Sequence, residues 1–228
     1  SLHHVNFPRC HVHSASEEKA LSVIVFGATG SVGRLAVEQL LTEGHEVTAF
    51  ARRIDALGIE HEQLRLFKGN AMRIERVVEA MEGHDAAVIA LGAGASRKSR
   101  VRSVGTQNVI EAMQLLGIRR LICQTTLGAG ESWANLNFFW KRSMFGLLLR
   151  PVFKDHEVQE HLVRDSGLDW TIVRPSALTD DPADGAFKVD LPPQERNLTL
   201  KISRADVAAF LARCVGEPVF MRRAVGIS

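Results

Sequence analysis

The sequence contains no tyrosine, only three cysteines and no apolar run long enough to cross a bilayer. Without tyrosine, no phenol can donate a proton in a reaction. Cys10, Cys123 and Cys214 are too few and too scattered for a disulfide framework or a zinc site. The longest apolar run, residues 144–149, is interrupted by a glycine, whereas a spanning helix needs roughly 20 residues. We therefore expect no metal and no membrane partner.

A strong charge of either sign is also lacking. The 28 Lys and Arg residues nearly balance the 26 Asp and Glu residues, so nothing favours nucleic acid as a partner. A hydrophobic content of 46% is typical of globular proteins, and 228 residues suffice for one large α/β domain. Cys123 and Cys214 lie in apolar stretches, as reduced buried thiols do, so we expect a cytoplasmic protein.

Residues 1–20 do not resemble the rest of the chain. They contain four histidines and Cys10, without periodicity or glycine punctuation. Imidazole and thiol groups are good metal ligands, so metal binding is one interpretation. We favour a disordered leader or a cloning remnant, because short His-rich tracts are weak signals. The folded domain is then expected to span residues 21–228.

The most informative stretch is an apolar run at residues 21–26, followed by Gly27, Gly30 and Gly33 and then an amphipathic segment up to Gly44. This order predicts a buried strand, a glycine turn and a helix. Glycines allow close approach of a pyrophosphate, and the helix start offers free N–H groups and a positive dipole end. The residues expected to contact a dinucleotide here are Gly27, Thr29, Gly30, Ser31 and Val32.

Strand and helix signals alternate along the remaining chain. Further strands are expected at residues 46–51, 64–67, 86–91, 120–124 and 170–173. Helices are expected at 72–81, at 101–116 and at 154–166, and a capping box at residues 203–206 opens a last helix. This alternation predicts a single-domain α/β fold with a doubly wound parallel sheet of the Rossmann type. Ligands then bind at the carboxyl ends of the strands.

The residues at two strand ends indicate which cofactor binds. Arg52 and Arg53 lie about 20 residues after the glycine turn, where an NAD site places an acidic residue on the ribose. Guanidinium groups suit a 2′-phosphate, so NADP (NADPH) is favoured over NAD; a pair of solvated surface arginines is the alternative. Leu91, Gly92 and Ala93 end another strand, where small residues allow the cofactor ribose and phosphates to approach, although a plain turn fits as well.

These residues, with Thr125, Thr126 and the run 166–175, resemble the atypical short-chain dehydrogenase/reductase superfamily. Within it, the order of His156, residues 164–168, Asp180, residues 185–187 and residues 202–206 is similar to the NmrA-like and biliverdin reductase B (flavin reductase) group. The resemblance covers nearly all of residues 21–228. It implies an NADPH-binding Rossmann domain that passes hydride to a flat conjugated acceptor, with Thr125 and Pro175 also at the cofactor.

Two departures from the wider superfamily stand out. Typical members use a Tyr-x-x-x-Lys pair, but here Val152 holds the tyrosine position and His156 the lysine position. The usual alcohol–ketone mechanism is therefore in doubt, and biliverdin reductase B likewise works without that pair. In addition, Asn70 stands where relatives often have Asp near the adenine, and an amide can still bond an adenine edge.

Thr126 and His156 are the candidate catalytic residues. Thr126 aligns with a serine that resembles the catalytic hydroxyl of the biliverdin reductase B group; a threonine capping a turn is the alternative. His156 could donate a proton near neutral pH or bond the ribose, or it could be an exposed histidine in the first turn of a helix. Glu160 lies one helical turn further on and could orient His156.

The stretch after residue 124 is rich in aromatic residues. These aromatic residues could form an apolar lid over a flat substrate, or they could pack a small subdomain or an oligomer contact. We favour packing for Phe138 and Phe139, and both interpretations stay open for Trp133. Asp180, Asp181 and Asp184 are expected to form an acidic surface turn.

The sequence therefore predicts an NADPH-dependent oxidoreductase that acts on a small planar molecule such as a flavin, quinone or bilin. An NmrA-like redox-sensing regulator that binds NADP without turnover is a second hypothesis, since the Tyr/Lys pair is missing. A reductase or isomerase of the isoflavone-reductase type is a third, although those relatives usually keep a catalytic lysine. The oligomeric state is left open.

Overall fold

Parallel strands form the centre of the molecule. The computed structural model describes residues 20–92, 100–128, 150–191 and 200–228. Its main sheet has seven strands, all parallel, in the order β3-β2-β1-β4-β5-β6-β9. They are β1 (Ser22–Phe26), β2 (Glu46–Ala51), β3 (Leu64–Lys68), β4 (Ala86–Ile89), β5 (Arg120–Gln124), β6 (Asp169–Pro175) and β9 (Arg223–Ile227). The predicted Rossmann-like single-domain α/β fold is confirmed.

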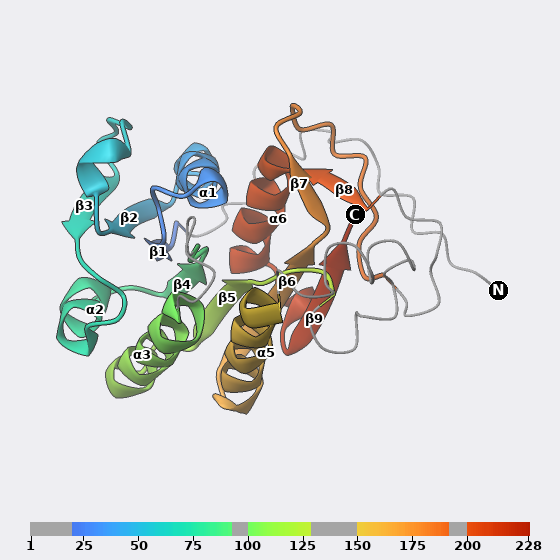
Figure 1. Cartoon of the computed structure of the whole chain (residues 1–228). Helices are drawn as coiled ribbons and strands as arrows, with labels where there is room; N and C mark the ends of the chain where they lie inside the picture. The colour runs from blue at the N-terminus through green and yellow to red at the C-terminus, as the bar shows by residue number, and fades with distance from the viewer. Residues whose placement is uncertain (1–19, 93–99, 129–149, 192–199) are drawn as a thin grey trace.

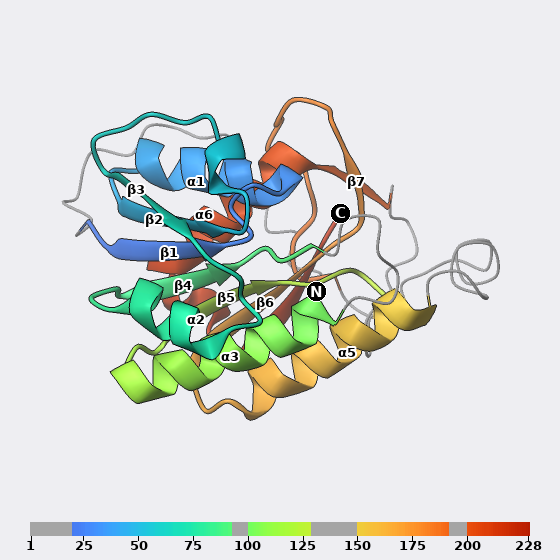
Figure 2. The same ribbon diagram turned by 60° about the vertical axis from the view of Figure 1, so that its left-hand side comes forward.

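Helices cover both faces of this sheet (Figures 1 and 2). On one face α1 (Ser31–Thr42) packs against α6 (Arg204–Gly216). On the other face lie α2 (Ile74–Met81), α3 (Val101–Leu116) and α5 (Arg150–Asp165). Two short 3-10 turns, η1 (Ile54–Ala56) and η3 (Pro218–Phe220), and a small parallel pair, β7 (Ala177–Thr179) with β8 (Lys201–Ser203), complete the described elements.

The first strand shows why the two layers form. Val23 and Val25 belong to the apolar cluster beneath α1 and α6, whereas Ile24 and Phe26 belong to the cluster beneath α2, α3 and α5. All four side chains are fully buried. Because successive side chains of a strand point to opposite faces, a continuous apolar run is the pattern of a strand covered on both sides.

The strand order reverses at β1, which pairs with β2 on one side and with β4 on the other. Helices following these strands therefore leave in opposite directions, and a crevice opens at the carboxyl ends of β1 and β4. The glycine turn lies at this position.

Several local predictions are confirmed and several boundaries differ. Gly117 ends α3 with a left-handed φ of 74°, and the Ser203 hydroxyl accepts a hydrogen bond from the backbone N–H of Asp206 at the start of α6. The helix expected at 154–166 begins earlier, at Arg150. β9 was not predicted, because its first residue is an exposed arginine and its apolar run is short.

Candidate functional site

The glycine turn is built on very close backbone contacts. Gly27 has a φ of 87°, and a Cβ atom there would lie 2.4 Å from the carbonyl oxygen of Ala90. A Cβ on Gly33 would lie 2.2 Å from the carbonyl oxygen of Gly27. Both distances are far below any van der Waals contact. Glycine is therefore required at both positions if α1 is to start directly against the ends of β1 and β4.

The N-terminus of α1 keeps its backbone donors available. Its N-cap is Gly30, which has no side chain to accept a hydrogen bond, and the first turn contains no acidic residue. The unpaired N–H groups and the positive end of the helix dipole therefore face the crevice together. This arrangement can hold a phosphate group.

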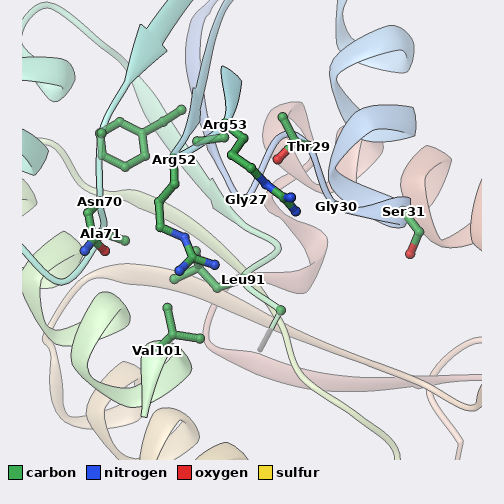
Figure 3. Close-up of a pocket in the computed structure, with 14 residues that line it drawn as sticks. Gly27, Thr29, Gly30, Ser31, Arg52, Arg53, Asn70, Ala71, Leu91 and Val101 are labelled. Atoms are coloured by element: carbon green, nitrogen blue, oxygen red, sulfur yellow. The ribbon is translucent and has the colours of Figure 1, made fainter. Parts of the chain in front are cut away.

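A cavity of about 310 Å³ extends from the glycine turn across the end of β2. Arg52 and Arg53 follow β2 and are exposed, and their side chains extend into this cavity (Figure 3). Asn70, which follows β3, also lines this cavity; its side-chain oxygen accepts a hydrogen bond from the Met72 N–H, leaving its NH₂ group available. Two cations and a free amide donor suit a phosphorylated ribose and a base edge.

A second cavity, of about 260 Å³, lies on the other side of the glycine turn. The two cavities share four lining residues: Gly30, Ser31, Leu91 and Gly92. The second is further lined by residues from the carboxyl ends of β5 and β6 and from the helices α3 and α5. These include Thr126, His156, Arg102, Gln124 and Ser176.

A buried ion pair fixes the ends of β5 and β6 beneath this second cavity. Glu160 on α5 pairs with Arg174 on β6, and the two side chains are only 4% and 3% exposed. The Thr125 hydroxyl donates a hydrogen bond to the same carboxylate over 2.8 Å. The Thr125 hydroxyl proton is thus used inside the protein. Among the described residues, the Thr126 hydroxyl has only a long contact of 3.4 Å, to the carbonyl oxygen of Leu127.

This ion pair corrects the expected role of Glu160. Glu160 does not orient His156; its carboxylate is held by Arg174 and Thr125, and His156 Nδ1 lies 3.1 Å from the side-chain oxygen of Gln159 instead. Gln159 in turn donates to the Thr106 hydroxyl. Gln159 and Glu160 follow His156 by three and four residues, so the helical spacing alone allows either of them to contact its ring. Glu160 is held by Arg174, which is distant in the sequence, and Gln159 contacts His156.

His156 is also not the exposed first-turn histidine that was considered. It is 7% exposed and lies in the second turn of α5. Burial, and then the nearby Arg102 cation, lower its pKa to about 4. His156 is therefore neutral at physiological pH. The lowered pKa disfavours the expected role of His156 as a proton donor near neutral pH, although its ring N–H can still form a hydrogen bond.

The structure brings the predicted site residues that it describes together around the two cavities. The first is lined by Gly27, Thr29, Gly30, Ser31, Arg52, Arg53, Asn70, Leu91 and Gly92, and the second by Val32, Thr125, Thr126, His156 and Pro175 as well as the shared residues. Ala93 and Trp133, like Phe138 and Phe139, lie outside the described residues. Asp180, Asp181 and Asp184 are exposed, as expected for a surface turn.

Four polar residues of the site were not predicted from the sequence. Arg102, Gln124 and Ser176 line the second cavity, and Arg204 donates a hydrogen bond from Nε to the Ser31 hydroxyl while pairing with Asp180. Arg102 did carry a signal. A cation in the first turn of a helix opposes the helix dipole, and such a placement is often functional.

The described cysteines match the expectation from composition. Cys123 and Cys214 are free and buried. No group of three or more His, Cys, Asp or Glu side chains in the described ranges could hold a metal ion. None of the helices in those ranges is long and apolar enough to span a membrane.

Comparison with known proteins adds an independent line of argument. A protein-family model described as NAD(P)H-binding matches residues 27–218. The UPF0659 protein YMR090W of Saccharomyces cerevisiae is 26% identical over 215 residues, which are 87% of this chain and 88% of the relative.

Solved structures are similar over nearly the whole chain. ChuY of Escherichia coli O157:H7, described as an anaerobillin reductase, is 27% identical with a TM-score of 0.72, over 90% of this chain and 96% of ChuY. A short-chain dehydrogenase/reductase of Veillonella parvula, solved in complex with NADP, is 18% identical with a TM-score of 0.77. It covers 92% of this chain and 95% of its own. At that identity the likeness concerns the fold alone.

Proposed function

The chain belongs to the NAD(P)H-binding family, and from this premise we propose that it is an NADPH-dependent oxidoreductase that passes hydride to a flat, conjugated acceptor. The observation that carries the proposal is the pair of cavities joined at the glycine turn. One cavity offers two arginines and the other offers hydroxyl and imidazole groups. A dinucleotide is long enough to place its phosphorylated ribose in the first and its nicotinamide in the second.

The cofactor preference rests on Arg52 and Arg53. Both lie in the first cavity, and Figure 3 shows their guanidinium groups extending into it. The pyrophosphate would lie at the N-terminus of α1, where Gly30 leaves the backbone donors free. These charges favour NADPH over NADH, because a 2′-phosphate gains charge-assisted hydrogen bonds that a 2′-hydroxyl does not.

At the acceptor end, bound NADPH supplies the hydride and the protein positions the acceptor and excludes water. Thr126 lines this cavity, and its hydroxyl has no short bond within the described structure, so it can donate to an acceptor oxygen or ring nitrogen. His156 is neutral and lines the cavity, where its ring can form a hydrogen bond. The proton that completes the reduction then comes from solvent.

Two considerations support a flat acceptor rather than an alcohol or ketone. The chain has no tyrosine to protonate an alkoxide. Moreover, ChuY, which is 27% identical, is described as an anaerobillin reductase. A flavin, quinone or bilin-like ring needs no such acid, because the electron pair spreads over the conjugated system. The free, buried cysteines support a reducing compartment such as the cytoplasm.

The test is to mix the protein with NADPH and a panel of flavin, quinone and bilin acceptors, and to follow the loss of nicotinamide absorbance. Thr126→Val should lower kcat by about tenfold, since it removes one hydrogen bond to the acceptor. Thr42→Val is the matched control, because the Thr42 hydroxyl bonds to the carbonyl oxygen of Glu38 in its own helix, outside both cavities.

A regulator that binds NADP without turnover is the competing function. The missing tyrosine and the neutral His156 favour it, because no described acid lies in the second cavity. Tight NADPH binding together with no turnover of any acceptor in the panel would support the regulator and reject the oxidoreductase.

A further inference from the structure

Two buried polar groups in the second cavity lack a hydrogen-bond partner among the described residues. They are Nη1 of Arg102 and the hydroxyl oxygen of Ser176. Ser176 is 7% exposed and follows the end of β6, while the Arg102 side chain is 14% exposed and projects from the first turn of α3. Leaving buried donors unpaired is costly, so such groups often mark the place where a ligand binds.

Asp155 does not satisfy Arg102. Its Oδ2 lies 3.8 Å from Arg102 Nη1, which is an ion-pair distance but too long for a hydrogen bond. The other carboxylate oxygen is taken by Ser103, which donates both its hydroxyl, over 2.5 Å, and its backbone N–H, over 3.2 Å. Asp155 is thus held by α3, and its Oδ2 is likewise buried without a hydrogen-bond partner among the described residues. Burial lowers the pKa of the Arg102 guanidinium, and the nearby Asp155 carboxylate offsets this only in part.

The other groups in the cavity do not provide a counter-charge. Its described lining contains no aspartate or glutamate. His156 is neutral, so Arg102 is the one charged side chain in this part of the lining. The hydroxyls of Thr126 and Ser176 add two further donors. A cavity with one cation, several donors and no described acid is complementary to a negatively charged oxygen.

We propose that the second cavity takes an acceptor that carries an anionic oxygen, such as an aromatic carboxylate, and that Arg102 and Ser176 bind this oxygen. The proposal rests on the proposed function, since it assumes that the nicotinamide lies in the same cavity. Oxidised nicotinamide is positively charged, so the attraction for an anion should be strongest when NADP⁺ is bound. Arg102 would then determine substrate specificity rather than transfer a proton.

The experiment measures binding without turnover. Wild-type protein saturated with NADP⁺ is titrated with benzoate and, separately, with benzamide, an uncharged analogue of the same shape, by ligand-observed NMR. Arg102→Met removes the charge, and Ser176→Ala removes the hydroxyl without disturbing any charge. Arg100→Met is the matched control, because Arg100 is exposed, lies just before the same helix and is outside the described lining of the cavity. Thermal unfolding verifies that each variant is folded.

We expect Arg102→Met to weaken benzoate binding by about tenfold or more, and Ser176→Ala by about fivefold, as expected for losing a charged and a neutral hydrogen bond. Benzamide binding should be the same in all variants, and Arg100→Met should bind benzoate like the wild type. If Arg102→Met does not fold, Ser176→Ala and Arg102→Lys, which keeps the charge and should retain most of the affinity, carry the test.

Three results would overturn the proposal. Benzoate could bind equally to the wild type and to both cavity variants, or it could fail to bind a wild-type complex that holds NADP⁺ normally. Alternatively, Arg102→Met could weaken NADP⁺ binding and leave benzoate binding unchanged, which would assign Arg102 to the cofactor phosphates instead. If NADP⁺ itself does not bind the wild type, the proposed function fails first, and the two failures are thereby distinguished.

Discussion

His156 is predicted to be neutral in the folded protein, and the cost of protonating it should be measurable as a loss of stability at acid pH. Its pKa is lowered from 6.5 to about 4, chiefly by burial and next by the Arg102 cation. Between these two values the unfolded chain binds a proton that the folded protein does not. The free energy of unfolding contributed by His156 is therefore complete above pH 6.5 and is lost as the pH falls toward about 4.

The magnitude follows from the two pKa values. The difference between 6.5 and about 4, at about 1.4 kcal/mol per pH unit, gives a maximal loss of about 3 kcal/mol. Over the convenient range from pH 7 to pH 5, about 2 kcal/mol of this should be lost. A His156→Gln variant cannot be protonated, so it should not show this part of the pH dependence.

The assay is urea unfolding of the wild type and of His156→Gln at several pH values between 7 and 5. The difference between the two free energies of unfolding removes the contribution of every other group, including His84, whose pKa is also lowered by burial. His61→Gln is the matched control, because it makes the same substitution at an exposed histidine. If the curves of the wild type and His156→Gln run parallel, His156 ionises in the folded protein near its ordinary pKa, and it could then serve as a proton donor.

Three further predictions follow from the glycine turn, the arginines and the buried ion pair. Gly33→Ala should weaken NADPH binding more than tenfold in titrations, since its Cβ would lie 2.2 Å from a carbonyl oxygen. Gly216→Ala is the control and should bind NADPH like the wild type, because a Cβ there has no atom within 4 Å. Arg52→Glu should lower the ratio of NADPH to NADH affinity by about tenfold or more; an unchanged ratio rejects the assignment of Arg52 to the 2′-phosphate. Glu160→Gln should lower the free energy of unfolding by about 3 kcal/mol, because the buried Arg174 would lose its ion pair with the Glu160 carboxylate; a loss below about 1 kcal/mol in urea unfolding would contradict this.

The parts of the fold that the sequence predicted are those with strong local signals. The run from Val23 to Phe26 is apolar at every position, and its glycine turn limits the possible connections, so strand, turn and helix were all found. The left-handed Gly117 and the capping Ser203 are likewise local. β9 was not predicted, because it is stabilised by pairing with β6 at the sheet edge, and its own five residues do not reveal this long-range contact.

The partners of side chains in the candidate site depend on long-range contacts even more strongly. Glu160 and His156 have the spacing of an interacting helical pair, but Arg174, on β6, takes the carboxylate. Arg102 belongs to α3 and is brought beside α5 only by packing of the two helices. Sequence patterns could therefore predict which strand ends form the site. They could not predict which buried charges are paired, because that depends on the tertiary arrangement.

The central claim, hydride transfer from NADPH within the second cavity, is tested most directly with NADPH that carries deuterium at one of its two C4 positions. With the best acceptor from the panel, one of the two deuterated forms should react more slowly and yield NADP⁺ without label, and the other should react at the ordinary rate and keep its label in NADP⁺. This is the outcome of a nicotinamide held with one face against the acceptor. NADPH that binds tightly and is not oxidised by any acceptor would contradict the claim.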